Sequence, residues 1–260
     1  MANTGLWVSA PARKPLPNRL TAVVPPASVE DKAAFGLNFE VLEPEATPYP
    51  HEVCATPTQL TTSKTFDGRD YVQSNHIVTL YAGVECGFLD FAEHAGKART
   101  KLELGESHAL EKFVREDVFT TGSEHVPAGS HLISQFAAAE QEALEAYQGE
   151  LLAHIPIHSL YNLYEADLLR KDGDGFRTLA GSRVVVGTGY LSNLPPTGGA
   201  TGTAGKEWVF FTGEMMIGKT GIEVHEGMEP ETNNHRAVAE QIYSIAVDGP
   251  IVGALLTLKG

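Results

Sequence analysis

One segment of the sequence matches a pattern that many proteins use to bind phosphate groups. Residues 213–220 read Gly-Glu-Met-Met-Ile-Gly-Lys-Thr, the spacing of a P-loop, in which backbone N–H groups and a lysine hold nucleotide phosphates. That chemistry also requires a helix whose N-terminus faces the phosphates. The bulky interior of the match and the alternating residues 220–224 instead favour a β-strand. A nucleotide hydrolase that uses Lys219 is therefore kept only as an alternative interpretation.

Other residue types suited to chemistry are scattered along the chain. His51, Cys54, Cys86 and His94 could ligate zinc, but only the first two are close together in sequence. The acidic stretch 172–175 reads Asp-Gly-Asp-Gly and is more typical of a turn than of a calcium loop. No Gly-x-Ser-x-Gly pattern for a nucleophile occurs. The motifs predict no catalytic residue, no cofactor and no metal, and hence a protein that is not an enzyme.

The composition narrows the class of protein further. The chain has 260 residues, 42% of them hydrophobic, which suffices for one large folded domain or two small ones. Its formal net charge of −14 argues against tight, sequence-independent binding to nucleic acid and against binding to an anionic membrane. Two cysteines exclude a disulfide framework and favour folding in a reducing compartment. No apolar run approaches the roughly 18 residues of a membrane span, and the N-terminus does not look like a signal peptide.

The N-terminal part of the chain is extended but apolar. Residues 1–57 hold nine of the fifteen prolines, which exclude a long helix or a central strand there. The same stretch carries many large apolar side chains, so we expect it to lie on its own domain or on a neighbouring copy. Residues 58–76 are polar and have a turn signal at Asp67-Gly68, which predicts a long, exposed hairpin-like loop.

Hydrophobic spacing predicts the remaining elements. A long helix is expected over residues 90–119, with Gly105 as a point where it could bend. A second helix is expected over 133–148, with its apolar side in the core and its glutamates, among them Glu140, in solvent. The apolar side of this second helix consists of Ile133, Phe136, Ala137, Leu144 and Tyr147. Further segments are a strand at 77–84, a strand at 154–157, a short helix at 160–169, a buried strand at 183–186, a glycine-rich loop at 191–205, and strands at 207–212, 214–217, 221–225, 242–247 and 254–258.

The order of these elements resembles that of a known family. Residues 111–122, Glu-Lys-Phe-Val-Arg-Glu-Asp-Val-Phe-Thr-Thr-Gly, are similar to the end of the spine helix in the major capsid proteins of tailed phages. Residues 153–189 resemble their axial domain, and residues 234–248 resemble a late strand of their peripheral domain. The resemblance implies an α+β chain with the Hong Kong 97-type capsid fold, which encapsulins share.

The resemblance also implies a division of the chain. Its parts are an N-terminal arm at 1–56, an extended loop at 57–77, the spine helix and peripheral domain at 78–132, the axial domain at 133–206, and returning peripheral-domain strands at 207–260. The glycine-rich loop would then lie near the five- or six-fold centre. We further expect that deleting residues 1–40 leaves a folded subunit that cannot assemble.

The function implied by the resemblance is structural. The chain would self-assemble, through pentamers and hexamers, into the icosahedral shell of a tailed bacteriophage, and would enclose double-stranded DNA without sequence-specific contact. It would reside in the virion capsid after assembly in the host cytoplasm, with scaffold or decoration proteins as further partners and no membrane contact. Alternatives are an encapsulin-like compartment shell and another virion component, such as a tail or connector protein. Candidate inter-subunit contacts are Trp7, Leu16, Leu20, Phe35, Phe39, Lys64, Asp67, Gly68, Arg69, Gly198 and Gly199.

Overall fold

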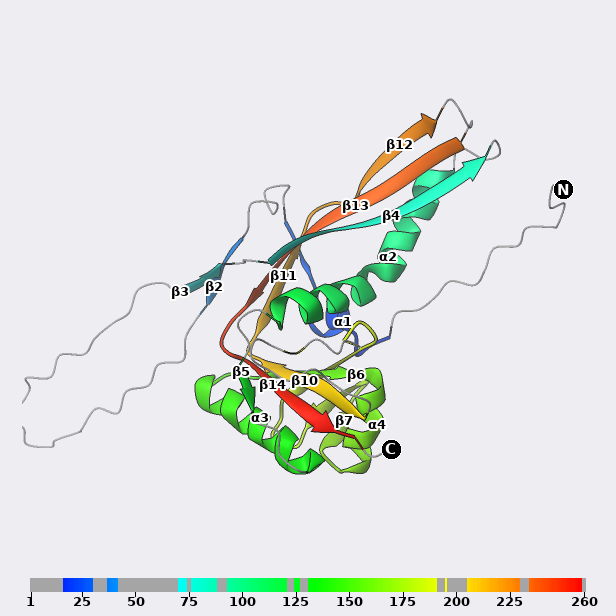
Figure 1. The fold of residues 1–260 in the computed structure, drawn as a ribbon. Coiled ribbons are helices and arrows are strands. Elements are labelled where there is room, and N and C mark those ends of the chain that lie inside the picture. The colour runs from blue at the N-terminus through cyan, green and yellow to red at the C-terminus, as the bar shows by residue number, and fades with distance from the viewer. Residues whose placement is uncertain are drawn as a thin grey trace, which may run out of the picture.

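The computed structural model describes residues 16–29, 37–41, 70–73, 76–87, 93–120, 124–126, 131–190, 195, 205–229 and 234–258. They form a mixed α+β structure with three sheets. Figure 1 shows a layer of long strands with one long helix against it, and a second body of strands and helices below.

The long strands form a five-stranded sheet around β13. Its members are β1 (Ala27–Ser28), β4 (His76–Gly87), β11 (Met215–Lys219), β12 (Glu223–Glu229) and β13 (Asn234–Val247). β13 pairs with β4 along one edge and with β12 and then β11 along the other. The predicted strand at 77–84 is confirmed, whereas β13 begins eight residues before the predicted 242, because the alternation of more and less buried residues continues back to residue 235.

Helix α2 (His94–Phe113) covers one face of this sheet (Figure 1). Its Ala98 and Leu102 pack on Ala237 and Ala239 of β13, and these small side chains let helix and sheet approach closely. The helix runs without interruption through Gly105 and continues as the π-helical turn η3 (Val114–Val118). The predicted long helix is thus confirmed and is not split at its glycine, and Figure 1 shows that its axis changes direction part-way along.

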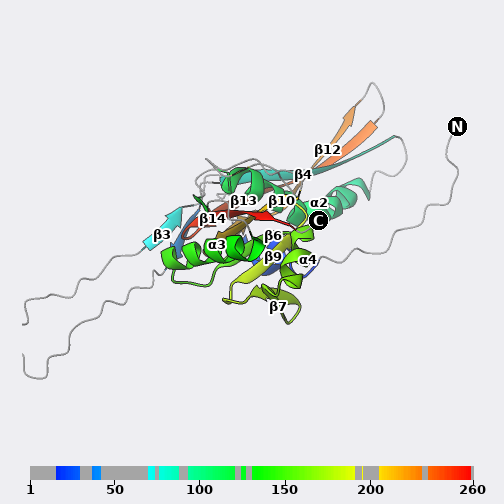
Figure 2. The ribbon, with the colours of Figure 1, turned by 60° about the horizontal axis from the view of Figure 1, so that its bottom comes forward.

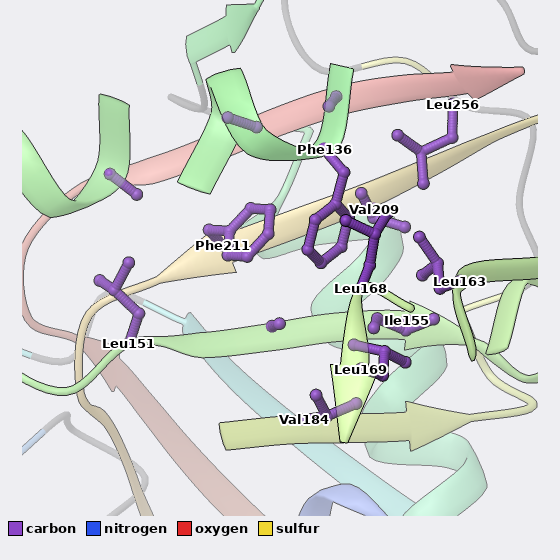
Figure 3. Packing of buried hydrophobic residues seen from close by; sticks show 14 of the residues in the cluster. Phe136, Leu151, Ile155, Leu163, Leu168, Leu169, Val184, Val209, Phe211 and Leu256 are labelled. Carbon is purple, nitrogen blue, oxygen red and sulfur yellow. The ribbon is translucent and has the colours of Figure 1, made fainter. Parts of the chain in front are cut away.

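The second body is built on a seven-stranded sheet in the order β5-β14-β10-β6-β9-β8-β7. The strands are β5 (Glu124–Val126), β6 (Leu152–Pro156), β7 (Leu169–Asp172), β8 (Gly175–Thr178), β9 (Arg183–Gly187), β10 (Lys206–Thr212) and β14 (Ile251–Thr257). On one face of the sheet, α3 (Leu132–Ala146) and α4 (Ile157–Glu165) bury a core that includes Phe136, Leu163 and Phe211 (Figures 2 and 3).

The other face of this sheet is covered as well. Trp208 and Phe210 of β10 pack against residues of α2, η3 and the first sheet, while the alternate Val209 and Phe211 enter the core under α3. A strand that is apolar at successive positions is explained by burial on both faces. The strands of residues 206–257 divide between the two sheets: β10 and β14 belong to the seven-stranded sheet, and β11, β12 and β13 belong to the five-stranded one.

Helix α3 forms as predicted but is rotated relative to the expected orientation. Ile133, expected in the core, is 55% exposed, and Leu144 is 39% exposed. Glu140, expected in solvent, is only 7% exposed. Its carboxylate accepts hydrogen bonds from the hydroxyls of Thr178 and Ser182. Burial of this carboxylate is tolerated because hydroxyl donors replace the water that it loses.

Residues 16–29, called the N-terminal segment below, pack on the rest of their own chain. The short helix α1 (Leu20–Val23) packs beside α2, and β1 pairs in parallel with β11. A third, two-stranded sheet joins β2 (Asn38–Val41) to β3 (Asp70–Gln73) in antiparallel register. These two strands bring together the two ends of residues 42–69.

Candidate functional site

The segment that matches a P-loop is a strand in the structure. Met215–Lys219 forms β11 inside the first sheet, and the next described element is another strand, β12. The Lys219 Nζ lies 3.1 Å from the Glu106 carboxylate of α2, so its charge is already paired. A side chain at Gly213 would collide with the backbone carbonyl of Asp248. The P-loop pattern that suggested a nucleotide hydrolase is therefore not present as a phosphate-binding loop, because this segment is a strand in the structure.

The described residues contain no group of three or more His, Cys, Asp or Glu side chains arranged to hold a metal ion. His51 and Cys54 lie outside the described residues, and His94 is buried at the start of α2. Among the helices of the described residues, none is long and apolar enough to cross a membrane.

The strongest polar cluster fastens the N-terminal segment to α2. Glu111 has no solvent exposure, and its two carboxylate oxygens accept hydrogen bonds from Arg19 Nε at 2.5 Å and Arg19 Nη2 at 2.7 Å. The backbone N–H groups of Leu20 and Gly189 donate to the same carboxylate at 3.3 and 3.1 Å. The hydroxyl of Ser107 approaches it at 3.4 Å. One buried carboxylate thus joins three segments that are distant in sequence.

The close approach at this cluster depends on glycine. A Cβ atom at Gly189 would lie 2.5 Å from the backbone carbonyl oxygen of His108 and 2.6 Å from the Cβ atom of Glu111. Such distances are below van der Waals contact, so only glycine lets this turn press against α2. The backbone carbonyl of Asn18 also accepts a hydrogen bond from Val186 N at 2.8 Å, which attaches the N-terminal segment to β9.

A second buried cluster lies between the two sheets. Thr212 donates its hydroxyl proton to the Gly213 carbonyl and so accepts from Nε2 of His154 at 3.1 Å. Nδ1 of His154 then accepts from the hydroxyl of Tyr190 at 2.9 Å. Burial lowers the pKa of His154 to about 3, and burial raises the pKa of Tyr190 above its usual range. Both groups are thus neutral hydrogen-bonding elements of the core at neutral pH.

Arg115 completes this interior. It is fully buried, and its guanidinium carbon lies 4.7 Å from the centre of the Phe210 ring, a distance typical of a cation–π contact. Burial lowers its pKa to about 10. The buried polar groups of these two clusters therefore hold α2, η3 and both sheets together.

The candidate contact residues fall into three groups. Leu16 is 54% exposed and available to a neighbour, and Phe39 is half-buried in β2. Leu20 is fully buried against its own chain, so it is withdrawn as a contact with another copy. The other candidates lie outside the described residues: Trp7, Phe35, Lys64, Asp67, Gly68, Arg69, Gly198 and Gly199.

The structure shows exposed apolar surfaces that the sequence reasoning missed. Besides Ile133 and Leu144 on α3, Leu179 is 63% exposed, and Tyr161 and Tyr164 of α4 are 72% and 53% exposed. The missed signal lay in α3, whose apolar residues span a wider arc than one contact with its own sheet can cover. Exposed apolar groups that are gathered together indicate contact with another protein surface.

Comparison with known proteins gives a result for the fold only. No protein-family model and no curated protein matches the sequence. Among solved structures, the virus-like particle from Pyrococcus furiosus matches with a TM-score of 0.54 and 15% identity over 90% of this chain and 90% of that chain. The capsid of the empty GTA particle matches with a TM-score of 0.53 and 12% identity, over 96% of this chain and 100% of that chain.

The capsid of Ralstonia phage GP4 matches with a TM-score of 0.53 and 10% identity, over 100% of this chain and 96% of that chain. This chain has the Hong Kong 97-type capsid fold. Because these matches cover nearly the whole chain, the capsid fold includes both large sheets and the long helix α2. The fold predicted from the order of elements is confirmed at this level.

Proposed function

We propose that this chain is a shell protein that self-assembles into the icosahedral capsid of a tailed bacteriophage and encloses its double-stranded DNA. The observation that carries the proposal is the match to the capsid subunit of Ralstonia phage GP4 over 100% of this chain and 96% of that one. A structural role also agrees with the clusters described above, whose polar groups are used up in holding the subunit together.

Each part of the chain then has a role in the shell. α2 is the spine helix, the five-stranded sheet is the peripheral domain, and the seven-stranded sheet with α3 and α4 is the axial domain. Pairing of β2 with β3 supports an extended loop that starts near residue 38, which is earlier than the 57 implied by the resemblance. Residues 1–15 are the part of the arm that would reach a neighbouring subunit.

The charge of the chain suits a container for DNA. With a formal net charge of −14, an assembled shell does not bind phosphates strongly, so enclosed DNA can move as it is packaged. Pentamers and hexamers of one chain would be the building units, formed in the host cytoplasm and found in the virion.

A compartment shell that holds protein cargo is the second candidate, because the virus-like particle from Pyrococcus furiosus matches with a TM-score of 0.54. The two candidates differ in contents, not in subunit fold. Particles that contain DNA support the phage capsid, whereas particles that contain a co-purifying enzyme support the compartment.

Electron microscopy with light scattering on the purified full chain tests the proposal. We expect closed particles of uniform size at raised protein concentration. Rings or tubes would indicate a connector or tail protein, and a monomer of 27.9 kDa at every concentration would refute the shell function.

A further inference from the structure

Helix α3 has more apolar surface than its own subunit covers. Leu132, Phe136 and the alanines behind them are buried on the sheet, but Ile133 and Leu144 are 55% and 39% exposed. At 100° per residue, Ile133, Ala137 and Leu144 lie on one line along the helix, directly beside its buried side. A helix with a second apolar line beside its buried side can pack on its own sheet and on another protein surface at the same time.

This line forms one wall of a groove. The α3 groove is defined here by Ala137, Gln141, Leu144, Glu145, Leu179 and Ala180, and its volume is about 420 Å³. Leu179, on the turn between β8 and β9, is 63% exposed and forms the opposite wall. Glu140 lies at the base, held by Thr178 and by Ser182 at 2.6 Å. These bonds tie the two walls together, so the groove is preformed.

A second exposed surface, which carries a positive charge where the groove carries a negative one, lies on α4 and the β7–β8 hairpin. Tyr161 and Tyr164 are 72% and 53% exposed. The Tyr164 ring packs edge-on against Phe176, with centroids 6.1 Å apart. Lys171 is exposed and stands directly opposite Phe176 in the β7–β8 ladder, which places it on the same face. The tyrosine patch is defined here as Tyr161, Tyr164 and Lys171.

We propose that the tyrosine patch of one copy docks in the α3 groove of the next copy, a contact that rests on the proposed shell function. Tyrosines are frequent anchors in interfaces because they bring large apolar area and a hydroxyl at little entropic cost. The Glu145 carboxylate at the groove accepts a hydrogen bond from the neutral amide of Gln141 at 2.7 Å, and within the described part of the chain neither Glu145 nor Lys171 at the patch forms an ion pair. The two opposite charges are therefore complementary.

The geometry of this contact leads to rings. Groove and patch are different surfaces of the same subunit, so the contact is heterologous: every copy offers one of each to its two neighbours. Such a contact closes into a ring when the rotation that relates one copy to the next is a whole-number fraction of a full turn. The contact thus joins the seven-stranded-sheet bodies around one symmetry axis of the shell.

The first test introduces a charge into the groove. The Leu179→Glu variant should raise the protein concentration needed for half-assembly by about tenfold or more, equivalent to about 1.4 kcal/mol. The matched Leu179→Met variant should assemble as the native chain does. Circular dichroism and thermal unfolding show whether each subunit is folded. A folded Leu179→Glu variant that assembles normally would refute the contact while the shell function stands.

The second test exchanges the two charges. Glu145→Lys and Lys171→Glu should each weaken assembly, and the double variant should recover most of the loss, because the ion pair is restored with reversed polarity. Recovery supports the contact, and a double variant weaker than both single variants overturns it. If the native chain forms no assembly at any concentration, the shell function and the contact both fail. If the native chain assembles but the variants assemble equally well, only the contact fails.

Discussion

The Arg19–Glu111 pair allows a quantitative prediction for the Arg19→Ala variant. Glu111 is fully buried and loses both guanidinium bonds, while the hydrogen bonds from Leu20 N and Gly189 N remain. Removing one partner of a buried ion pair costs about 3–5 kcal/mol. Because the Arg19 side chain keeps 16% exposure, we expect a loss of about 3 kcal/mol in the free energy of unfolding. The corresponding decrease in Tm is roughly 6–12 °C.

Urea unfolding of the unassembled subunit, followed by circular dichroism, measures this loss. The matched control is Lys112→Ala on the same helix, whose Nζ lies 4.0 Å from Glu116 with both side chains exposed. This control should cost less than about 1 kcal/mol. The Arg19→Ala, Glu111→Gln double variant should be more stable than Arg19→Ala alone, because a neutral amide replaces a buried charge without a partner. The reasoning is refuted if Arg19→Ala costs no more than the control, or if the second substitution gives no recovery.

Three further predictions concern pH, the N-terminus and salt. The pKa of His154 is about 3 in the folded state and 6.5 unfolded, so the unfolded chain binds the extra proton between these values. The titration of His154 should therefore leave the free energy of unfolding unchanged above pH 6.5 and lower it by up to about 1.4 kcal/mol per pH unit as the pH drops towards 3. An acid-unfolding curve of His154→Gln should lack this contribution, and a curve identical to that of the native chain would contradict the prediction. Deleting residues 1–29 should lower the Tm because it removes Arg19, Leu20 and β1, whereas deleting residues 1–15 should leave the Tm unchanged and impair assembly. Calorimetry measures the Tm and light scattering measures assembly, and a 1–29 deletion as stable as the full chain would contradict the structure. Subunits of charge −14 repel one another, so added salt should strengthen assembly, and particles that dissolve in salt would show that ion pairs are the main attraction.

The expected deletion of residues 1–40 illustrates how the structure changes an experiment. The proline content predicts an extended segment without a long helix, and its described residues, 16–29 and 37–41, contain one four-residue helix and two short strands. It does not show that Leu20 is buried in the core or that Val29 N bonds to the Lys219 carbonyl. Removing the first 40 residues would therefore damage the subunit itself, and the shorter deletion is the informative one.

Periodicity was sufficient for elements that have one clear partner surface. The spacing of Ala98, Leu102 and Val114 predicts the long helix, and the structure buries these three residues. It was insufficient for α3, where apolar residues surround more than half of the helix. Which part of that arc faces the sheet depends on the position of β10 and β14, and these strands come from the far end of the chain.

Within the described residues, local sequence by itself indicated the two long helices and several of the strands, and it showed that the P-loop match at 213–220 behaves as a strand. These properties depend on neighbours within a few residues, through backbone sterics and side-chain spacing. Only the tertiary structure decided that Glu111 meets Arg19, that His154 is buried and neutral, and that Ile133 and Leu144 remain exposed. The environment of each of these groups is made by segments that are tens of residues away, and no local pattern specifies how those segments come together.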